Sequence, residues 1–167
     1  MLCERSLTGI GQRTFFDRPS RAFFSSRQCP GSAIRAATDW AIAQAKAKNV
    51  VMSGFHSPLE QSVLEILLVA RSPAIIVLAR AVDQATIAQP WQDAIREGHL
   101  TMISENCTNG SSVRLTKARA QTRNELIATL ATTLCIAHAS ETGSLAMQVA
   151  KWRTEGRMIS MLSATQQ

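Results

Sequence analysis

Short apolar runs alternate with longer segments of helical periodicity along most of this chain. A run rich in β-branched residues, such as "AIIVLA" at 74–79, predicts a buried strand. A segment whose apolar residues recur every three or four positions, such as 33–48, predicts a helix. The expected strands are 21–26, 50–53, 74–79, 100–104, 133–139 and 157–162. The expected helices are 33–48, 58–70, 90–98, 115–131 and 144–156, with a loop at 105–112.

This alternation predicts an α/β fold of three layers, a doubly wound and mostly parallel sheet with helices on both faces. We expect one domain over 21–167, preceded by a partly ordered polar and basic lead-in at 1–20. Ligands of such sheets bind outside the carboxyl ends of the strands. Four small polar loops follow strands and should meet there: "SSRQCPGS", "SGFHSP", "ARAVD" and "HASETGS".

Charge and composition narrow the range of functions. The 167 residues carry 18 Lys and Arg against 12 Asp and Glu, a net charge of +6, which favours a polyanionic partner. Tyr is absent and aromatic residues make up 5% of the chain, so a broad base-stacking surface is not expected. We find neither a secretory signal nor a membrane span, and the four Cys are widely spaced, which indicates reduced thiols in a cytoplasm.

The loop "SSRQCPGS" could hold an anion. Gly31 precedes a predicted helix, whose free backbone N–H groups favour phosphate. Ser26 belongs to the same loop, and Arg27 adds a guanidinium that can bind phosphate through two hydrogen bonds. The equally good alternative is an ordinary turn in which Ser32 caps the helix.

The loop "SGFHSP" repeats this arrangement. Gly54, after Ser53, allows close approach of the backbone, and Ser57 is expected to cap a helix that begins at Pro58. His56 could donate a hydrogen bond to a phosphate or a base. A single His in a loop is more often structural or solvated, so both interpretations stay open.

The third loop and one helix add further candidates. Gly143 and Ser144 lie at a helix N-terminus, where a phosphate site and a plain turn with a cap are both plausible. On the helix 115–131, Arg119 and Arg123 share a face, and Asn124 follows Arg123. Arg114 and Lys117 fit an ordinary solvated face. The recurrence of one loop design at three strand ends is what favours a site.

Catalytic groups are few. Cys29, His56 and His138 could meet at the same edge, and Glu60 and Glu141 are acid–base candidates only through their position. No residues show metal-ligand spacing, and the sequence indicates no catalytic set, metal or cofactor.

Several motifs in one order resemble the Rossmann-like domain of the DNA-processing protein A (DprA/Smf) family, in its short stand-alone form, over residues 21–162. The motifs are "SSRQCPGS", "SGFHSPLEQSVLEILLVARSP", "LAR" ending at Arg80, "TRNELIATLA" and "AHASETGSLAMQVAKWRTEGR". The resemblance implies a Rossmann-like fold that binds single-stranded DNA at the strand ends. In full-length members it also implies loading of a recombinase during natural transformation. The family's motif positions fall on Ser25, Ser26, Arg27, Ser53, Gly54, Arg123, Asn124, Gly143, Ser144 and Leu145.

The sequence departs from the family pattern at several places. Ser25 stands where the family has Gly, "SGFHSPLE" replaces SGxARGID, and "AMQ" at 146–148 replaces Thr-Ala-Arg. The additional domains of full-length members have no room in 167 residues, so recombinase loading is not expected. The related phosphoribohydrolases carry PGGxGTxxE, which "ETGSLAMQ" does not match.

These observations favour a non-enzymatic, cytoplasmic DNA-binding protein of DNA processing and recombination, with a homodimer as a possible assembly. The alternative is a nucleotide-binding protein or phosphoribohydrolase-like enzyme that holds one nucleotide phosphate in the same loops, with Glu60 or Glu141 as the acid or base. A third interpretation is a degenerate domain that only dimerises.

Overall fold

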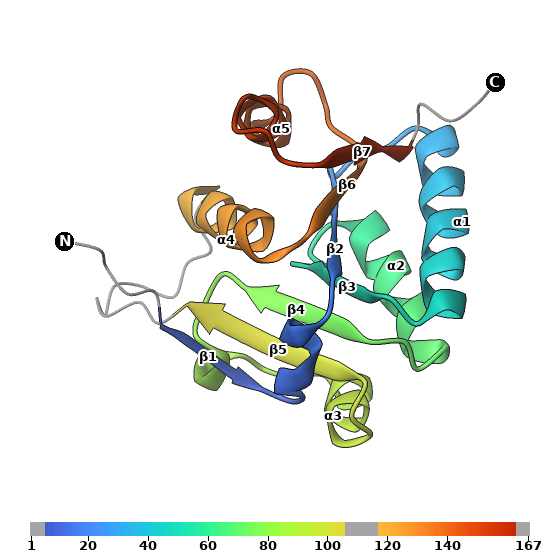
Figure 1. The fold of residues 1–167 in the computed structure, drawn as a ribbon, viewed down its shortest axis with the longest axis vertical. Helices are drawn as coiled ribbons and strands as arrows, with labels where there is room; N and C mark the ends of the chain where they lie inside the picture. Colours follow the sequence, from blue (N-terminus) through green and yellow to red (C-terminus); the bar gives the residue numbers. More distant parts are fainter. Residues whose placement is uncertain (1–5, 106–116, 163–167) are drawn as a thin grey trace.

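The computed structural model describes residues 6–105 and 117–162, and they form a seven-stranded sheet between two layers of helices (Figure 1). The strand order is β1-β5-β4-β3-β2-β6-β7. Among the strand pairs of the described residues, only β1–β5 is antiparallel. The strands are β1 (Leu7–Ile10), β2 (Ser20–Ser25), β3 (Val50–Ser53), β4 (Ala74–Leu78), β5 (Leu100–Glu105), β6 (Thr133–His138) and β7 (Ile159–Met161).

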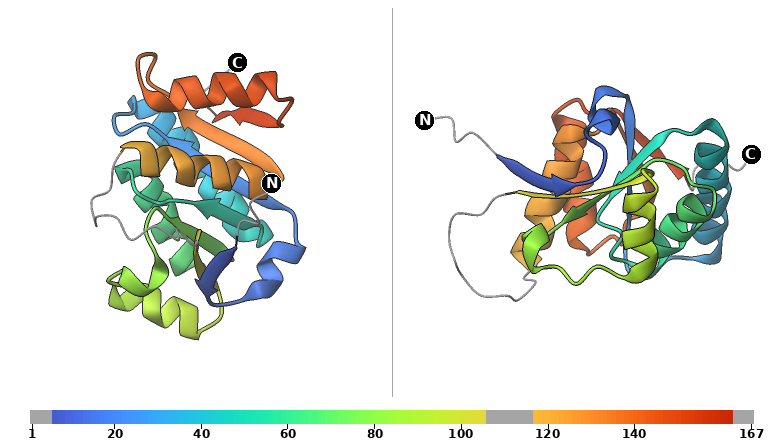
Figure 2. Two further views of the ribbon diagram at one scale, coloured as in Figure 1. Left: turned by 90° about the vertical axis from the view of Figure 1, so that its left-hand side faces the viewer. Right: turned by 90° about the horizontal axis from the view of Figure 1, so that it is seen from below.

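The helices divide between the two faces of the sheet. One face carries α1 (Gly31–Ala47), α2 (Pro58–Val69) and α3 (Gln89–Arg96). The other carries α4 (Lys117–Leu130) and α5 (Ser144–Thr154), which lie side by side in both views of Figure 2. Two short 3₁₀ helices, η1 (Arg13–Asp17) and η2 (Val82–Gln84), complete the described chain. The predicted three-layer, mostly parallel α/β fold is confirmed.

The central strands are buried on both faces because alternate residues point to opposite helix layers. Phe23 packs toward α1, with its ring centroid 5.2 Å from that of Trp40. Phe24 points to the opposite layer, where its centroid lies 4.9 Å from that of Trp152 on α5. One continuous run, "AFF", therefore supplies both hydrophobic cores.

The path of the chain creates one reversal in strand order. From β2 the chain moves outward through β3 and β4 to β5, then returns through α4 to place β6 on the other side of β2. Strands β2, β3, β4 and β6 are mutually parallel, so the four polar loops that follow them lie at one edge, as predicted. The reversal between β2 and β6 is the point at which open α/β sheets bind ligands.

Sequence and structure differ in two details. Strand β1 was not predicted, because all four of its residues are exposed at the sheet edge and show no buried pattern. Helix α1 begins at Gly31 with Pro30 as its N-cap, so Ser32 is not the cap that the alternative interpretation required. The predicted loop 105–112 and Arg114 fall mostly or wholly on residues outside the described ranges.

Two helix ends agree with the pattern of glycines. Gly98 and Gly156 follow α3 and α5 with φ of +85° and +77°, a conformation that glycine adopts most readily.

In the described part of the chain, no helix combines the length and the apolar character needed to cross a bilayer.

Candidate functional site

Hydrogen bonds join the loop after β2 to the loops on either side of it. The Ser25 and Ser57 hydroxyl oxygens lie 2.8 Å apart, which links the loops after β2 and β3. On the other side, the Ser26 hydroxyl accepts a 2.8 Å hydrogen bond from the backbone N–H of Ser140, in the loop after β6. Ser26 N–H also donates to the His138 carbonyl. The three predicted loops therefore form one connected rim at the point where the strand order reverses.

The carboxylate of Glu60 fixes the inner side of this rim. Its Oε2 accepts from the backbone N–H of Ser25 at 3.1 Å, and its Oε1 accepts from the N–H groups of His56 and Ser57 at 2.9 and 3.3 Å. The Ser57 hydroxyl accepts in turn from Glu60 N–H, which completes a capping box at the start of α2. Glu60 is only 6% exposed, so three backbone donors hold a buried carboxylate.

A second charged group lies beside the same loop. The guanidinium of Arg123, on α4, packs directly against Gly54, and a Cβ built on Gly54 would lie 2.6 Å from both Cζ and Nε of Arg123. A side chain at residue 54 would therefore have to displace the guanidinium from this position. This contact brings α4 to the strand-end loops and unites two of the predicted site residues.

Arg123 is a half-buried cation whose guanidinium is hydrogen-bonded to one neutral side chain, Asn124. Its Nε and Nη2 donate to Oδ1 of Asn124 at 3.3 and 3.2 Å. Burial lowers the pKa of the Arg123 guanidinium, and the negative charge of Glu60 acts in the opposite direction. Among residues 6–105 and 117–162, no carboxylate forms an ion pair with it. Such a cation is suited to an external phosphate.

Arg27 and Gly31 lie on the outer side of the rim. Arg27 is exposed and borders a pocket of about 360 Å³ whose other walls include Cys29, Ile34 and Leu59. An added Cβ on Gly31, the first residue of α1, would meet no atom within 4 Å beyond its chain neighbours and its own helix backbone, so a side chain would have room there. His56 is also exposed and is displayed by the turn, while its backbone N–H is held by Glu60.

The remaining predicted site residues lie at the end of β3, at the start of α5, after β4 and on α4. Ser53 is fully buried, and its hydroxyl accepts from Phe55 N–H at 3.1 Å, so it shapes the turn. Gly143 is the N-cap of α5 and Ser144 its first residue. Arg80 follows β4, and Arg119 lies one turn before Arg123 on α4.

The hydrogen bonds of Cys29 and Glu60 indicate that these two candidate catalytic side chains stabilise the fold. The Cys29 thiol donates to the Ser26 carbonyl at 3.1 Å, and burial raises its pKa, which makes a reactive thiolate scarce. Glu60 is engaged by backbone donors, whereas Glu141 is exposed. No group of three metal-ligating side chains occurs within the residues that the structure describes.

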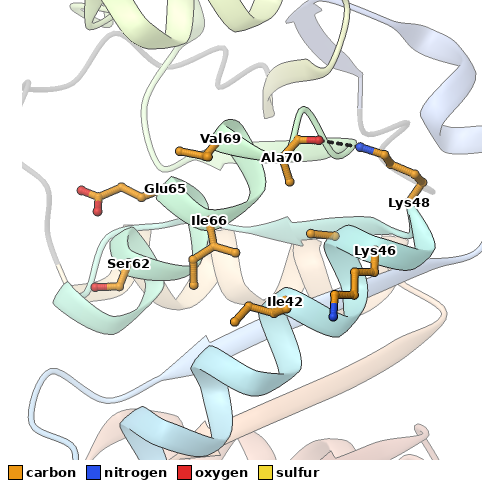
Figure 3. A pocket seen from close by; sticks show the side chains of 9 residues that line it. Ile42, Lys46, Lys48, Ser62, Glu65, Ile66, Val69 and Ala70 are labelled. Carbon is orange, nitrogen blue, oxygen red and sulfur yellow. Dashed lines mark hydrogen bonds between the residues drawn. The ribbon is translucent and has the colours of Figure 1, made fainter.

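A second hollow lies away from this rim, between α1 and α2 (Figure 3). It is lined mainly by aliphatic side chains, including Ile42, Ile66 and Val69, with Lys46 and Glu65 at its borders. Lys48 closes one end by donating to the Ala70 carbonyl. Its apolar lining makes it unsuited to phosphate.

The family that is described as DNA recombination-mediator protein A matches residues 5–166. The chain belongs to this family. The resemblance that the motifs carry is therefore confirmed, and the connected rim lies within the matched region. No curated protein sequence matches the chain.

Solved structures of two DNA processing A proteins share the fold. The protein from Streptococcus pneumoniae superposes with a TM-score of 0.73 at 19% identity, over 92% of this chain and 53% of that chain. The chain thus spans about half the length of the pneumococcal protein. The protein from Helicobacter pylori, described as having a unique single-stranded DNA binding mode, gives a TM-score of 0.72 at 17% identity, over 92% and 69% of the two chains.

A similar fold also occurs in a molybdenum cofactor binding protein from Rippkaea orientalis. Its TM-score is 0.58 at 12% identity, over 85% of this chain and 74% of that chain. At these levels of identity the solved structures establish the fold and not the ligand.

The sequence patterns point to Ser25 and Ser26 as motif residues, but not to the hydrogen bonds by which they connect the rim. The sequence presents Glu60 as an acid or base and Ser57 as a helix cap, and the spacing Ser57-x-x-Glu60, which is that of a capping box, is the signal that relates them. The links from Ser25 to Ser57 and from Ser26 to Ser140 join positions 32 and 114 residues apart, and no local pattern announces them.

Proposed function

We propose that this member of the DNA recombination-mediator protein A family binds single-stranded DNA, without catalysis, at the rim where Arg27, Gly54 and Arg123 lie. The observation that carries the proposal is the half-buried Arg123 guanidinium, held against Gly54 beside the strand reversal and paired with no carboxylate of the described residues. The negative charge of Glu60 partly compensates this half-buried cation, although the two form no ion pair, and a DNA phosphate would supply a directly bound anion.

Charge and family support the choice of ligand. The net charge of +6 favours a polyanion over a neutral small molecule. The Helicobacter pylori protein with the same fold is described as binding single-stranded DNA. The scarcity of aromatic residues suggests that phosphate contacts, rather than base stacking, contribute most of the affinity.

Fluorescence anisotropy of a labelled oligo-dT at several salt concentrations tests the proposal, with a mononucleotide as competitor. We expect binding that weakens steeply with salt, with a log–log slope of about −0.7 per neutralised phosphate. The mononucleotide should not displace the oligonucleotide. Affinity that does not change with salt would refute the phosphate-based site.

A nucleotide ligand is the second candidate, because the pocket beside Arg27 has a volume of about 360 Å³, within the usual range for small-molecule sites. Full displacement of oligo-dT by a mononucleotide, with no preference for longer strands, would favour it. A hydrolase would need a free carboxylate such as that of Glu60 as its acid or base. Three backbone N–H groups already donate to this carboxylate, which favours a structural role for it.

The wider role that we propose is DNA processing and recombination in the cytoplasm, including natural transformation, with the protein as a homodimer. Family membership supports the recombination role. Light scattering of the purified protein with and without oligo-dT tests the assembly. Recombinase loading is not part of this proposal.

A further inference from the structure

On the basis of the proposed function, we propose that Gln148 is a positioning residue for Arg123. It lies on α5, forms its side-chain hydrogen bonds with Asn124, Gln121 and Glu125 rather than with the guanidinium, and acts through Asn124. Its amide fixes which end of the Asn124 amide faces Arg123. This residue belongs to the "AMQ" segment, in which the chain departs from the family pattern.

The first step is the orientation of the Gln148 amide. Its Nε2 donates to the Gln121 carbonyl at 3.0 Å and to Oε1 of Glu125 at 3.3 Å. Both partners are acceptors, so only the NH₂ end of the amide can face them. The carbonyl oxygen of Gln148 must therefore point the other way, toward Asn124.

In the second step, the oriented Gln148 amide fixes the orientation of the Asn124 amide, which contacts Arg123. Oε1 of Gln148 lies 3.1 Å from Nδ2 of Asn124 and accepts its hydrogen bond. With its NH₂ end held by Gln148, Asn124 presents Oδ1 to Nε and Nη2 of Arg123. If the Asn124 amide rotated by 180°, its NH₂ group would meet the N–H donors of the guanidinium and repel them.

The far end of this network is anchored in the core. Gln148 is 7% exposed and Trp152 is fully buried. The Trp152 indole N–H donates to Oε2 of Glu125 at 3.1 Å, which directs the other carboxylate oxygen toward Gln148. A continuous series of hydrogen bonds therefore runs from the buried indole of Trp152 to the guanidinium of Arg123. Within this series, the side-chain amides of Gln148 and Asn124 can each take only one orientation.

The decisive readout is the mobility of the Arg123 side chain, measured without DNA. We expect the Nε–H resonance of Arg123 to show a high heteronuclear NOE in the unaltered protein and a lower one in Gln148→Met, which keeps the side-chain length but makes no hydrogen bond. Gln44→Met is the matched control, since Gln44 also accepts a hydrogen bond from an Asn side chain, Asn49, at 2.8 Å. The control should leave the Arg123 resonance unchanged.

Binding of oligo-dT provides the second readout. Gln148→Met should weaken binding about fivefold to tenfold, on the order of one lost hydrogen bond, and should weaken it no further in an Arg123→Ala background. An additional loss in that background would show that Gln148 acts by another route and would overturn the inference.

Two further outcomes separate the inference from the proposed function. If the unaltered protein does not bind oligo-dT, the proposed function fails, while the NMR comparison still decides the role of Gln148. If Gln148→Met does not fold, hydrogen exchange of the Asn124 side-chain amide in the unaltered protein decides instead. Slow exchange supports the hydrogen bond to Gln148, and exchange as fast as that of an exposed Asn overturns it.

Discussion

The guanidinium of Arg123 occupies the space that a side chain at residue 54 would need. Cζ and Nε of Arg123 would lie 2.6 Å from a Cβ at Gly54. A glycine after β3 therefore does more than permit a turn, because it lets α4 deliver a cation to the strand-end edge. This relationship connects the loop motif to the arginine motif, which are about 70 residues apart in sequence.

The first prediction concerns Gly54→Ala. The added methyl group must displace the guanidinium, which lies at the end of a flexible side chain, so we expect a small change in stability and a clear loss of oligo-dT affinity. The loss should approach that of Arg123→Ala. Anisotropy and thermal unfolding of the purified variants measure the two effects.

Gly156→Ala is the control for this substitution. An added Cβ at Gly156, beyond the C-terminal end of α5, meets no atom within 4 Å, but its φ of +77° costs alanine about 1 kcal/mol. We expect unchanged DNA affinity and a modest loss of stability. Equal affinities for Gly54→Ala and Gly156→Ala would contradict the role of Arg123.

The second prediction concerns the salt dependence of binding. Arg27→Ala and Arg123→Ala should each flatten the log–log salt slope by about 0.7, the value for one phosphate contact on a single strand. Arg96→Ala serves as the control, because Arg96 ends α3 near the opposite edge of the sheet and pairs with Asp93. A slope altered equally by all three variants would indicate a diffuse charge effect rather than a site.

The third prediction concerns Glu60. Its removal leaves three backbone N–H groups at the rim without their acceptor, and each unsatisfied buried donor costs about 1–3 kcal/mol. We expect Glu60→Ala to lower the free energy of unfolding by about 2–4 kcal/mol, since water restores part of the bonding. Urea unfolding measures this change.

Glu65→Ala, on the exposed face of the same helix, is the control for Glu60→Ala and should change stability by no more than about 0.5 kcal/mol. A Glu60→Ala variant as stable as this control would show that the backbone donors find other acceptors. The rim would then not depend on the carboxylate.

Much of the fold follows from local patterns in the sequence. The strand "VVMS" and the start of α2 at Pro58 are predicted at the residues where they occur, because a run that is buried on both faces and a Ser-Pro cap are strong signals. Strand β1 escapes prediction because its edge position leaves all four residues exposed. It lies at the edge of the described sheet, antiparallel to β5.

The site is only partly predictable from the sequence, because part of it follows from the strand order and part from contacts between distant elements. Parallel strands bring their following loops to one edge, so the meeting of Ser26, Gly54 and Gly143 near that edge follows from topology. The contact of Gly54 with Arg123 depends on how α4 packs across the sheet, which periodicity alone does not determine. The orientation of the side-chain amides of Asn124 and Gln148 depends on a hydrogen bond between helices α4 and α5, and no sequence motif encodes it.

The last prediction concerns the pH dependence of stability at Glu125. Desolvation acts to raise the pKa of this carboxyl group, but hydrogen bonds from Trp152, Lys151 and Gln148 outweigh it and hold the pKa below its ordinary value of 4.5. A group whose pKa is lower in the folded state stabilises the protein above the unfolded pKa, and that stability is lost as the pH falls through the folded pKa. Glu125→Gln should therefore be less stable than the unaltered protein at pH 7, and the difference should narrow between about pH 5 and pH 3. Urea midpoints at pH 7, 5, 4 and 3 measure it, with Glu65→Gln as the control for the substitution itself. A difference that stays constant over this range would mean that the carboxylate gains nothing from its three donors, and the anchoring of Gln148 through Glu125 would lose its electrostatic basis.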